Sequence, residues 1–205
     1  MSVIGVIDSG ISNIRSVTNA LRAIGASYRQ VVKPEDVDGC SHLILPGDGT
    51  FHAGMEQLHQ SGLDDALIQA ARQGKYILGI CLGMQLLAQS SNEFGVCSGL
   101  GLIPGHVTNL VPADSAYPVP NIGWNCVQFA AHARLAKDEG ESGVYYFMHS
   151  YAYSDPKGSY VAATFDYSGD VVAMIEHENL FGVQFHPEKS QQRGLKLLAC
   201  FAELQ

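Results

Sequence analysis

Basic side chains are scarce in this chain of 205 residues, which holds 12 Lys and Arg against 20 Asp and Glu and carries a formal net charge of −8. That balance argues against a general nucleic-acid binder, because such proteins usually present a basic face to the phosphates. Long apolar runs are lacking too. Residues 3–7 and 76–82 are strand-sized runs, far short of the roughly 20 residues that span a bilayer. We therefore expect neither a nucleic-acid partner nor a membrane segment.

Cysteine is infrequent, and its spacing matches no metal-binding pattern. The five cysteines form an odd set without a Cys-x-x-Cys pair, so neither a disulfide framework nor a thiolate zinc site is indicated. The first residues lead straight into a strand-like stretch, without a basic segment or a cleavage site of small residues. We therefore expect a reduced, cytoplasmic protein with no metal and no cofactor.

The first half of the chain alternates between two kinds of apolar spacing. Residues 3–7 form an almost continuously apolar run, as expected of a buried strand, and residues 28–32, 42–45 and 76–80 are three further expected strands. Helical spacing of apolar residues separates the first run from the second and the third from the fourth. Such alternation predicts a parallel sheet with right-handed crossovers.

The second half is rich in short β-type segments, at residues 124–129, 144–147, 160–165 and 171–175, with Pro, Gly and Asp between them. We expect these to be antiparallel strands that extend one side of the sheet. A final helix is expected to bury Leu195, Leu197, Leu198, Phe201 and Leu204. The whole pattern predicts one α/β domain over residues 1–205, with a largely parallel central sheet flanked by helices and an antiparallel β extension.

A cysteine stands where an apolar strand should turn sharply into a helix, in the segment Gly79-Ile80-Cys81-Leu82-Gly83. This is the pattern of a nucleophile elbow with sulfur in place of a hydroxyl, and an amphipathic helix is expected to follow it directly. The two glycines would keep bulk out of the sharp turn. The positive helix end would favour a thiolate, and the N–H of Leu82 could stabilise an oxyanion.

A thiol nucleophile needs a base, and the segment His186-Pro187-Glu188 supplies a candidate. Pro187 favours an extended conformation at His186. In extended backbone, side chains two residues apart point the same way, so Glu188 could bond one imidazole nitrogen and leave the other facing Cys81. We therefore expect Cys81, His186 and Glu188 to form a catalytic triad.

These two segments resemble those of the class I, triad-type glutamine amidotransferases. Further similar segments lie at residues 13–17, 45–49, 99–105, 123–125 and 147–151, so the resemblance covers essentially the whole chain. Within the family it is greatest to the glutaminase subunits of imidazole glycerol phosphate synthases, as residues 123–125 and 186–190 indicate. The resemblance implies a flavodoxin-like arrangement and hydrolysis of glutamine through a γ-glutamyl thioester on Cys81.

The resemblance also implies roles for residues outside the triad. An oxyanion-binding segment would comprise Gly47, Asp48 and Gly49 together with Leu82. The substrate glutamine would be held by Gln85 and by the backbone around His149, Ser150 and Tyr151. Four positions depart from the family pattern: Ser9 and Ser12 stand where an aromatic residue and a glycine are common, Asp48 is usually a small or apolar residue, and Asn121 is more often a histidine.

A partner is expected because ammonia must reach an acceptor without becoming ammonium, and the chain has no glycine-rich phosphate loop of its own. By resemblance the partner is a cyclase subunit of (β/α)₈-barrel fold, in a heterodimer, which converts PRFAR to imidazole glycerol phosphate and AICAR. The candidate interface residues are Asn13, Trp124, Asn125 and Lys189.

Other interpretations of the sequence remain open. A paralogous glutaminase that donates ammonia to a surface-polysaccharide amino-sugar pathway would keep the triad and depart from the family pattern at these same four positions. A hydrolase could use the same elbow on another acyl substrate. A catalytically silent interaction module would not need the intact triad.

Overall fold

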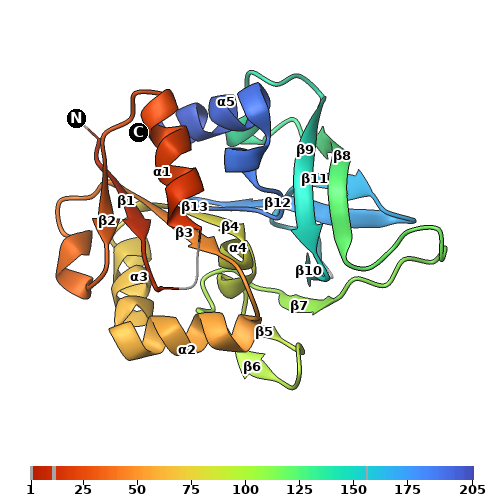
Figure 1. Ribbon diagram of the computed structural model, residues 1–205, viewed down its shortest axis with the longest axis horizontal. Helices are drawn as coiled ribbons and strands as arrows, with labels where there is room; N and C mark the ends of the chain where they lie inside the picture. The colour runs from red at the N-terminus through yellow and green to blue at the C-terminus, as the bar shows by residue number, and fades with distance from the viewer. Residues whose placement is uncertain (1, 11–12, 156) are drawn as a thin grey trace.

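The computed structural model describes residues 2–10, 13–155 and 157–205, so Ser12 lies outside the described residues. Its centre is a nine-stranded sheet in the order β2-β1-β3-β4-β13-β12-β11-β8-β9 (Figure 1). The strands from β2 to β13 are parallel, and those from β13 to β9 pair antiparallel. This confirms the predicted α/β fold, a largely parallel sheet with an antiparallel extension.

Five parallel strands form one half of the sheet: four are those predicted in the first half of the chain, and the fifth comes from residues 180–183. They are β1 (Ile4–Ile7), β2 (Tyr28–Val31), β3 (His42–Gly47), β4 (Tyr76–Cys81) and β13 (Leu180–Val183). Both faces of the four inner strands β1, β3, β4 and β13 are covered, as expected of buried parallel strands, whereas the edge strand β2 exposes Arg29 and Gln30. Along β3, for example, Ile44 joins one core cluster, while Leu43 and Leu45 join the other.

Helices cover the two faces in pairs. On one face lie α1 (Ile14–Ala23) and α5 (Gln191–Ala202); on the other lie α2 (Phe51–Ser61) and α3 (Leu63–Arg72) (Figure 1). Val17 and Leu198 enter the first core, whereas Leu58 and Leu67 enter the second. In the final helix, Leu197, Leu198 and Phe201 are fully buried as expected, but Leu195 is only half-buried and Leu204 lies beyond the helix end.

The antiparallel extension consists of β8 (Asn121–Phe129), β9 (Ser142–His149), β11 (Val161–Asp166) and β12 (Asp170–His177). A second, small sheet was not predicted. It joins β10 (Tyr151–Ser154), β7 (His106–Asn109), β5 (Ser90–Ser91) and β6 (Cys97–Ser98). Its strands have two to four residues, too few for a periodic signal in the sequence.

The helix after the elbow differs from the expectation. Instead of an amphipathic helix there is α4 (Leu82–Leu86), five residues long and buried on every side. It carries no charged residue and is enclosed by β3, β4, β13 and α2, so no polar face is needed. Within the described residues, no helix is both long and apolar enough to cross a membrane.

Candidate active site

Cys81 occupies a strained turn between β4 and α4. Its φ of 54° and ψ of −112° are unusual for a residue with a side chain. A Cβ on Gly79 would lie 2.5 Å from the Gly83 carbonyl oxygen, and a Cβ on Gly83 would lie 1.8 Å from the Leu45 carbonyl oxygen. Only glycine fits at either position, as the elbow pattern predicts.

His186 lies at the same edge of the sheet. Because β13 runs parallel to β4, with Val183 opposite Ile80, the chain after β13 emerges beside Cys81. The His186 N–H donates to the Tyr146 carbonyl (2.8 Å). The Ser190 hydroxyl donates to the His186 carbonyl (2.6 Å). The backbone that carries the imidazole is therefore fixed from two sides.

Glu188 contacts the imidazole as expected, but by a different local geometry. His186 is extended (φ −100°, ψ 96°), whereas Pro187–Lys189 forms a 3₁₀ turn, so the two side chains do not share a strand face. The Glu188 Oε1 lies 2.8 Å from His186 Nδ1, and the side chains are only 4% and 3% exposed. The turn, rather than extended backbone, brings the carboxylate behind the ring.

Glu188 leaves the other imidazole nitrogen of His186, Nε2, available to interact with Cys81. His186 Nε2 is buried and makes no hydrogen bond of standard geometry within the described residues. Burial alone would lower the pKa of His186, but the interactions with Cys81 and Glu188 raise it to about 10. The structure thus brings together the three predicted triad residues.

The predicted oxyanion segment lies next to the elbow. Gly47 pairs with Cys81 in the β3–β4 register, and Gly49 has a φ of 91°. Leu82 is the first residue of α4, so its N–H has no partner within the helix. The Asp48 carboxylate accepts a hydrogen bond from the Asn13 N–H (3.1 Å), which ties this segment to the start of α1.

A cavity of about 590 Å³ opens over Cys81. All four predicted glutamine-binding residues line it, namely Gln85, His149, Ser150 and Tyr151, together with Asp48, Gly49 and Leu82. The Gln85 Nε2 donates to the Tyr151 carbonyl (2.9 Å) and to Gln184 Oε1 (3.0 Å). The cavity wall is therefore held by side-chain hydrogen bonds from three segments far apart in the sequence.

Two residues of this site were missed by the sequence reasoning. Gln184 is fully buried, and its Nε2 lies 3.7 Å from the Cys81 sulfur as a hydrogen-bond donor. Glu93 is buried in the cavity wall, where its Oε2 accepts from the Phe51 N–H (2.6 Å). The sequence shows the charge of Glu93 but not its burial in a cavity, because the residue lies 12 positions from the elbow in an irregular segment.

The four candidate interface residues differ in exposure and in the contacts that they make. Trp124 is 48% exposed on β8, and Lys189 lines the cavity. Asn125 is half-buried and donates to Asn121 Oδ1 (3.1 Å). The Asn13 side chain caps α1 by accepting from the Ser16 N–H (3.3 Å).

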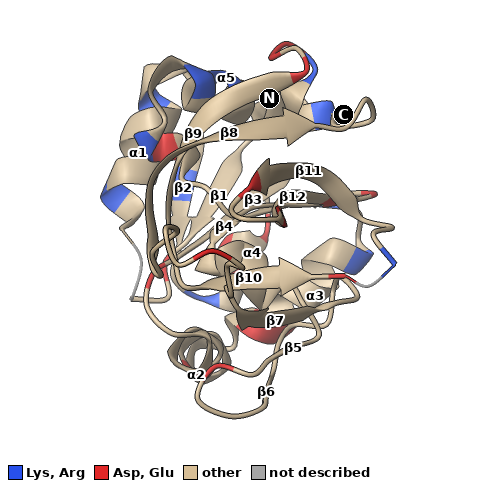
Figure 2. Cartoon of the chain, turned by 90° about the vertical axis from the view of Figure 1, so that its right-hand side faces the viewer, with Lys and Arg blue, Asp and Glu red and all other residues tan. Residues whose placement is uncertain are grey.

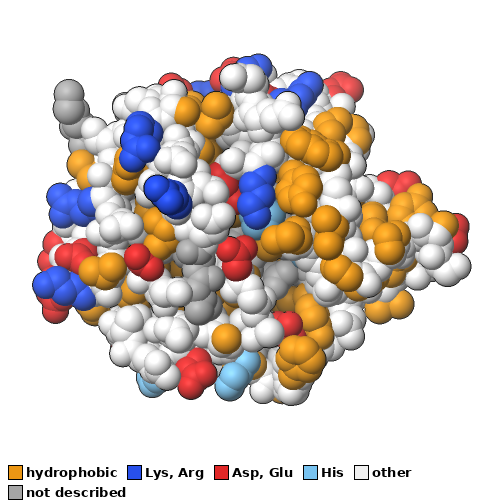
Figure 3. All heavy atoms as spheres, viewed as in Figure 1, with side chains coloured by type: hydrophobic (Ala, Val, Ile, Leu, Met, Phe, Trp, Pro, Cys, Tyr) orange, Lys and Arg blue, Asp and Glu red, His pale blue; other side chains and the backbone are white. Residues whose placement is uncertain are grey.

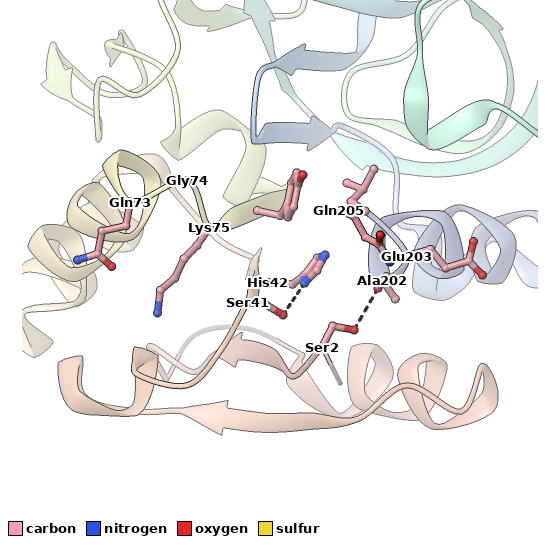
Figure 4. Close-up of a pocket in the computed structure, with 11 residues that line it drawn as sticks. Ser2, Ser41, His42, Gln73, Gly74, Lys75, Ala202, Glu203 and Gln205 are labelled. Atoms are coloured by element: carbon pink, nitrogen blue, oxygen red, sulfur yellow. Dashed lines mark hydrogen bonds between the residues drawn. The ribbon is translucent and has the colours of Figure 1, made fainter.

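A larger cavity, of about 950 Å³, lies at the opposite edge of the sheet, around the starts of β3 and β4 and the end of α5 (Figure 4). His42 bonds Ser41 there (2.8 Å), but its Nε2 has no hydrogen-bond partner within the described residues. Burial lowers the pKa of this histidine. Because no carboxylate orients the ring and no predicted site residue lines the cavity, it is not the candidate active site.

Comparisons with known proteins agree with this geometry. The family described as "Glutamine amidotransferase class-I" matches residues 5–203. "Imidazole glycerol phosphate synthase subunit HisH" of Listeria monocytogenes serotype 4b is 42% identical over 202 residues, covering 98% of this chain and 96% of the relative. "Imidazole glycerol phosphate synthase hisHF, chloroplastic" of Arabidopsis thaliana is 40% identical over 98% of this chain, but only 34% of that longer protein.

A solved structure described as "Crystal structure of glutamine amidotransferase" has the same fold, with a TM-score of 0.77, 21% identity and 98% coverage of both chains. The family match covers nearly the whole chain, and the curated relatives are well above 30% identity. The chain therefore belongs to the class-I glutamine amidotransferase family.

Proposed function

We propose that this chain is the glutaminase subunit of an imidazole glycerol phosphate synthase. It hydrolyses glutamine to glutamate and ammonia and delivers the ammonia to a separate cyclase subunit. The identity to HisH over the full length of both chains supports this acceptor over an amino-sugar pathway. The observation that supports the chemistry is that Cys81, which lines the cavity, lies beside His186, whose imidazole is in turn bonded to Glu188.

The proposed reaction has two stages. The Cys81 sulfur attacks the side-chain amide carbon of glutamine, and the N–H groups of Leu82 and the oxyanion segment stabilise the charge on oxygen. His186 protonates the departing nitrogen, so the C–N bond breaks and leaves a thioester. Water, deprotonated by His186, then attacks the thioester and releases glutamate. Glu188 keeps the imidazole oriented through both stages.

Substrate recognition follows from the charges in the cavity. Free glutamine carries an α-ammonium and an α-carboxylate group. Glu93 is a buried carboxylate in the wall and is the proposed ligand of the ammonium group. The backbone of Ser150 and Tyr151, together with Gln85, is proposed to hold the rest of the substrate.

The partner is proposed to dock on an uncharged face beside the cavity. Neither β8 nor β9 contains a charged residue (Figure 2), and apolar side chains gather over these strands (Figure 3). The exposed members are Ile122 (58%), Trp124 (48%), Val144 (44%) and Met148 (38%). Ile122 and Met148 also line the cavity, so a partner on this apolar patch would cover the cavity mouth and keep ammonia from water.

This chain matches only 34% of the Arabidopsis relative, which is a longer protein named as a synthase. That match supports a close physical association between this domain and a synthase. We propose a heterodimer with a barrel-shaped cyclase, and one amidotransferase domain over residues 1–205. A reducing, cytoplasmic compartment is proposed because the reaction needs Cys81 as a free thiol.

The test uses glutamine labelled with ¹⁵N in its side-chain amide, in the presence of the cyclase subunit, PRFAR and excess unlabelled ammonium. We expect slow glutamine hydrolysis by the isolated chain, stimulation by the loaded partner, and ¹⁵N in the imidazole glycerol phosphate formed. Cys81→Ala, assayed in parallel, should give no labelled product. Product that takes its nitrogen from the solvent ammonium pool, or an isolated chain as fast as the complex, would contradict the proposal.

A further inference from the structure

His149 is part of the wall of the proposed glutamine cavity, and its ring packs beside aromatic side chains. It is only 6% exposed, and the rings of Phe147 and Phe165 lie 5.7 and 6.0 Å from its own. Burial lowers the pKa of His149 to about 4, so the imidazole is neutral at pH 7. A neutral imidazole has one N–H donor and one acceptor nitrogen, and its surroundings must supply the complementary groups.

Those surroundings specify a single tautomer. Nδ1 faces the Tyr151 carbonyl oxygen at 2.8 Å, so Nδ1 must carry the proton. Nε2 must then accept, and the Asn121 Nδ2 lies 3.0 Å from it. Asn121 is itself 2% exposed and stands directly opposite His149 in the β8–β9 register.

The orientation of the Asn121 amide is also fixed. The Asn125 Nδ2 donates to Asn121 Oδ1 at 3.1 Å, which leaves the Asn121 N–H directed at the imidazole. With the Asn121 amide turned over, an oxygen would face the Nε2 lone pair and a donor would face the donor of Asn125. The hydrogen bonds therefore run in one direction, from Asn125 through Asn121 and His149 to the Tyr151 carbonyl.

The chain of bonds ends in the substrate cavity. The Tyr151 carbonyl accepts from His149 Nδ1 and also from Gln85 Nε2, which is 2.9 Å away. Gln85 continues to Gln184, which donates to the Cys81 sulfur. A change in the ring of His149 thus alters the carbonyl against which Gln85 is placed.

We propose that Asn121 is a positioning residue for glutamine binding: it fixes the Nδ1–H tautomer of His149 and, through the Tyr151 carbonyl, the Gln85 side chain in the cavity wall. The inference rests on the proposed glutaminase function for its kinetic consequence, whereas the tautomer is a property of the folded chain alone. Asn121 is not among the residues that line the cavity, and its side chain bonds His149 and Asn125. It acts through His149.

The test combines nitrogen NMR of the full chain, labelled with ¹⁵N at histidine, with steady-state kinetics of glutamine hydrolysis in the presence of the cyclase subunit. In the wild-type protein, His149 should show a protonated Nδ1 and a hydrogen-bonded, unprotonated Nε2. Asn121→Asp keeps the side-chain size but can only accept at this position. It should protonate Nε2 and raise the KM for glutamine about tenfold, with a smaller effect on kcat.

Two variants separate positioning from mere packing. Asn121→His keeps an N–H donor at this position, so this variant should show the wild-type His149 signals and the wild-type KM. Gln128→Leu changes an exposed amide at the other end of β8 and should alter neither. A purely structural role predicts instead that KM follows the thermal stability of each variant, whatever the state of His149.

The outcomes distinguish this inference from the proposed function. A protonated Nε2 of His149 in the wild-type protein would overturn the inference, and this result does not depend on whether any variant folds. A folded Asn121→Asp protein with a protonated Nε2 but an unchanged KM would overturn it too. Failure of the wild-type complex to hydrolyse glutamine would instead refute the proposed function, and the NMR signals would still test the link between Asn121 and His149.

Discussion

The α-carbon of Gly83 faces the Leu45 carbonyl so closely that a Cβ there would lie 1.8 Å from the oxygen. This contact between the first turn of α4 and β3 determines how near Cys81 can approach the oxyanion segment. The elbow is therefore a packing requirement as well as a catalytic device.

Gly83→Ala should destabilise the protein by about 3 kcal/mol or more, because a backbone oxygen cannot move aside as a flexible side chain does. The matched control is Gly25→Ala: its φ is +72° but no atom lies within 4 Å of the added Cβ. Backbone strain alone should cost about 1–2 kcal/mol there. Urea unfolding of the two variants measures the difference, and equal losses of stability would show that the predicted clash is relieved without cost.

Glu188→Gln should lower the pKa of His186, because an amide cannot stabilise the imidazolium as a carboxylate does. The loss of orientation and charge should reduce kcat by about 10²- to 10⁴-fold. An NMR pH titration of His186 and a glutaminase assay measure the two effects. An unchanged pKa of His186 in a folded variant would refute this role of Glu188.

The same raised pKa makes a prediction for stability against pH. Since the pKa of His186 in the folded state, about 10, exceeds the ordinary value of 6.5, its contribution is complete below pH 6.5 and is lost as the pH rises toward 10. The difference in unfolding free energy between wild type and Glu188→Gln should therefore be larger at pH 6 than near pH 10. A difference that grows with rising pH would contradict this sign.

Glu93→Gln should raise the KM for glutamine by about 10- to 100-fold, because a charge-assisted hydrogen bond to the α-ammonium group is lost. The decisive control is glutaramate, which is glutamine without the α-amino group. Wild type and Glu93→Gln should hydrolyse it equally well. A variant that is impaired to the same degree on both substrates would place Glu93 outside amino-group recognition.

Ile122→Asp should weaken binding of the cyclase subunit by about tenfold or more, because a charge would be buried in the apolar patch. The control is Val32→Asp, since Val32 is similarly exposed (53%) but follows β2 at the far side of the sheet. Titration calorimetry with the cyclase subunit compares them. Equal affinities of the two variants would remove the patch from the interface.

Most of the parallel half of the sheet was predictable, because the inner strands are largely apolar and α1 and α3 show helical spacing of apolar residues. The elbow was also predictable from local sequence, because the backbone comes too close at Gly79 and Gly83, on either side of Cys81, for any residue but glycine. The pairing of His186 with Glu188 was also expected, although a 3₁₀ turn, not an extended strand, produces it.

Other features depend on distant segments and leave no local pattern. Gln184 contacts Cys81 across 103 positions, and Asn121 contacts His149 across 28. Glu93 reaches the cavity from an irregular segment beside a two-residue strand. Because α4 is enclosed on every side, its burial could not be inferred from a helical face.

Reaction with 6-diazo-5-oxo-norleucine, followed by peptide mass mapping, tests the nucleophile most directly. This glutamine analogue should modify Cys81 alone, and the adduct should disappear in Cys81→Ala while the variant remains folded. Glutamine hydrolysis that persists in Cys81→Ala, or an adduct on another residue with Cys81 untouched, would contradict a thioester mechanism at this elbow.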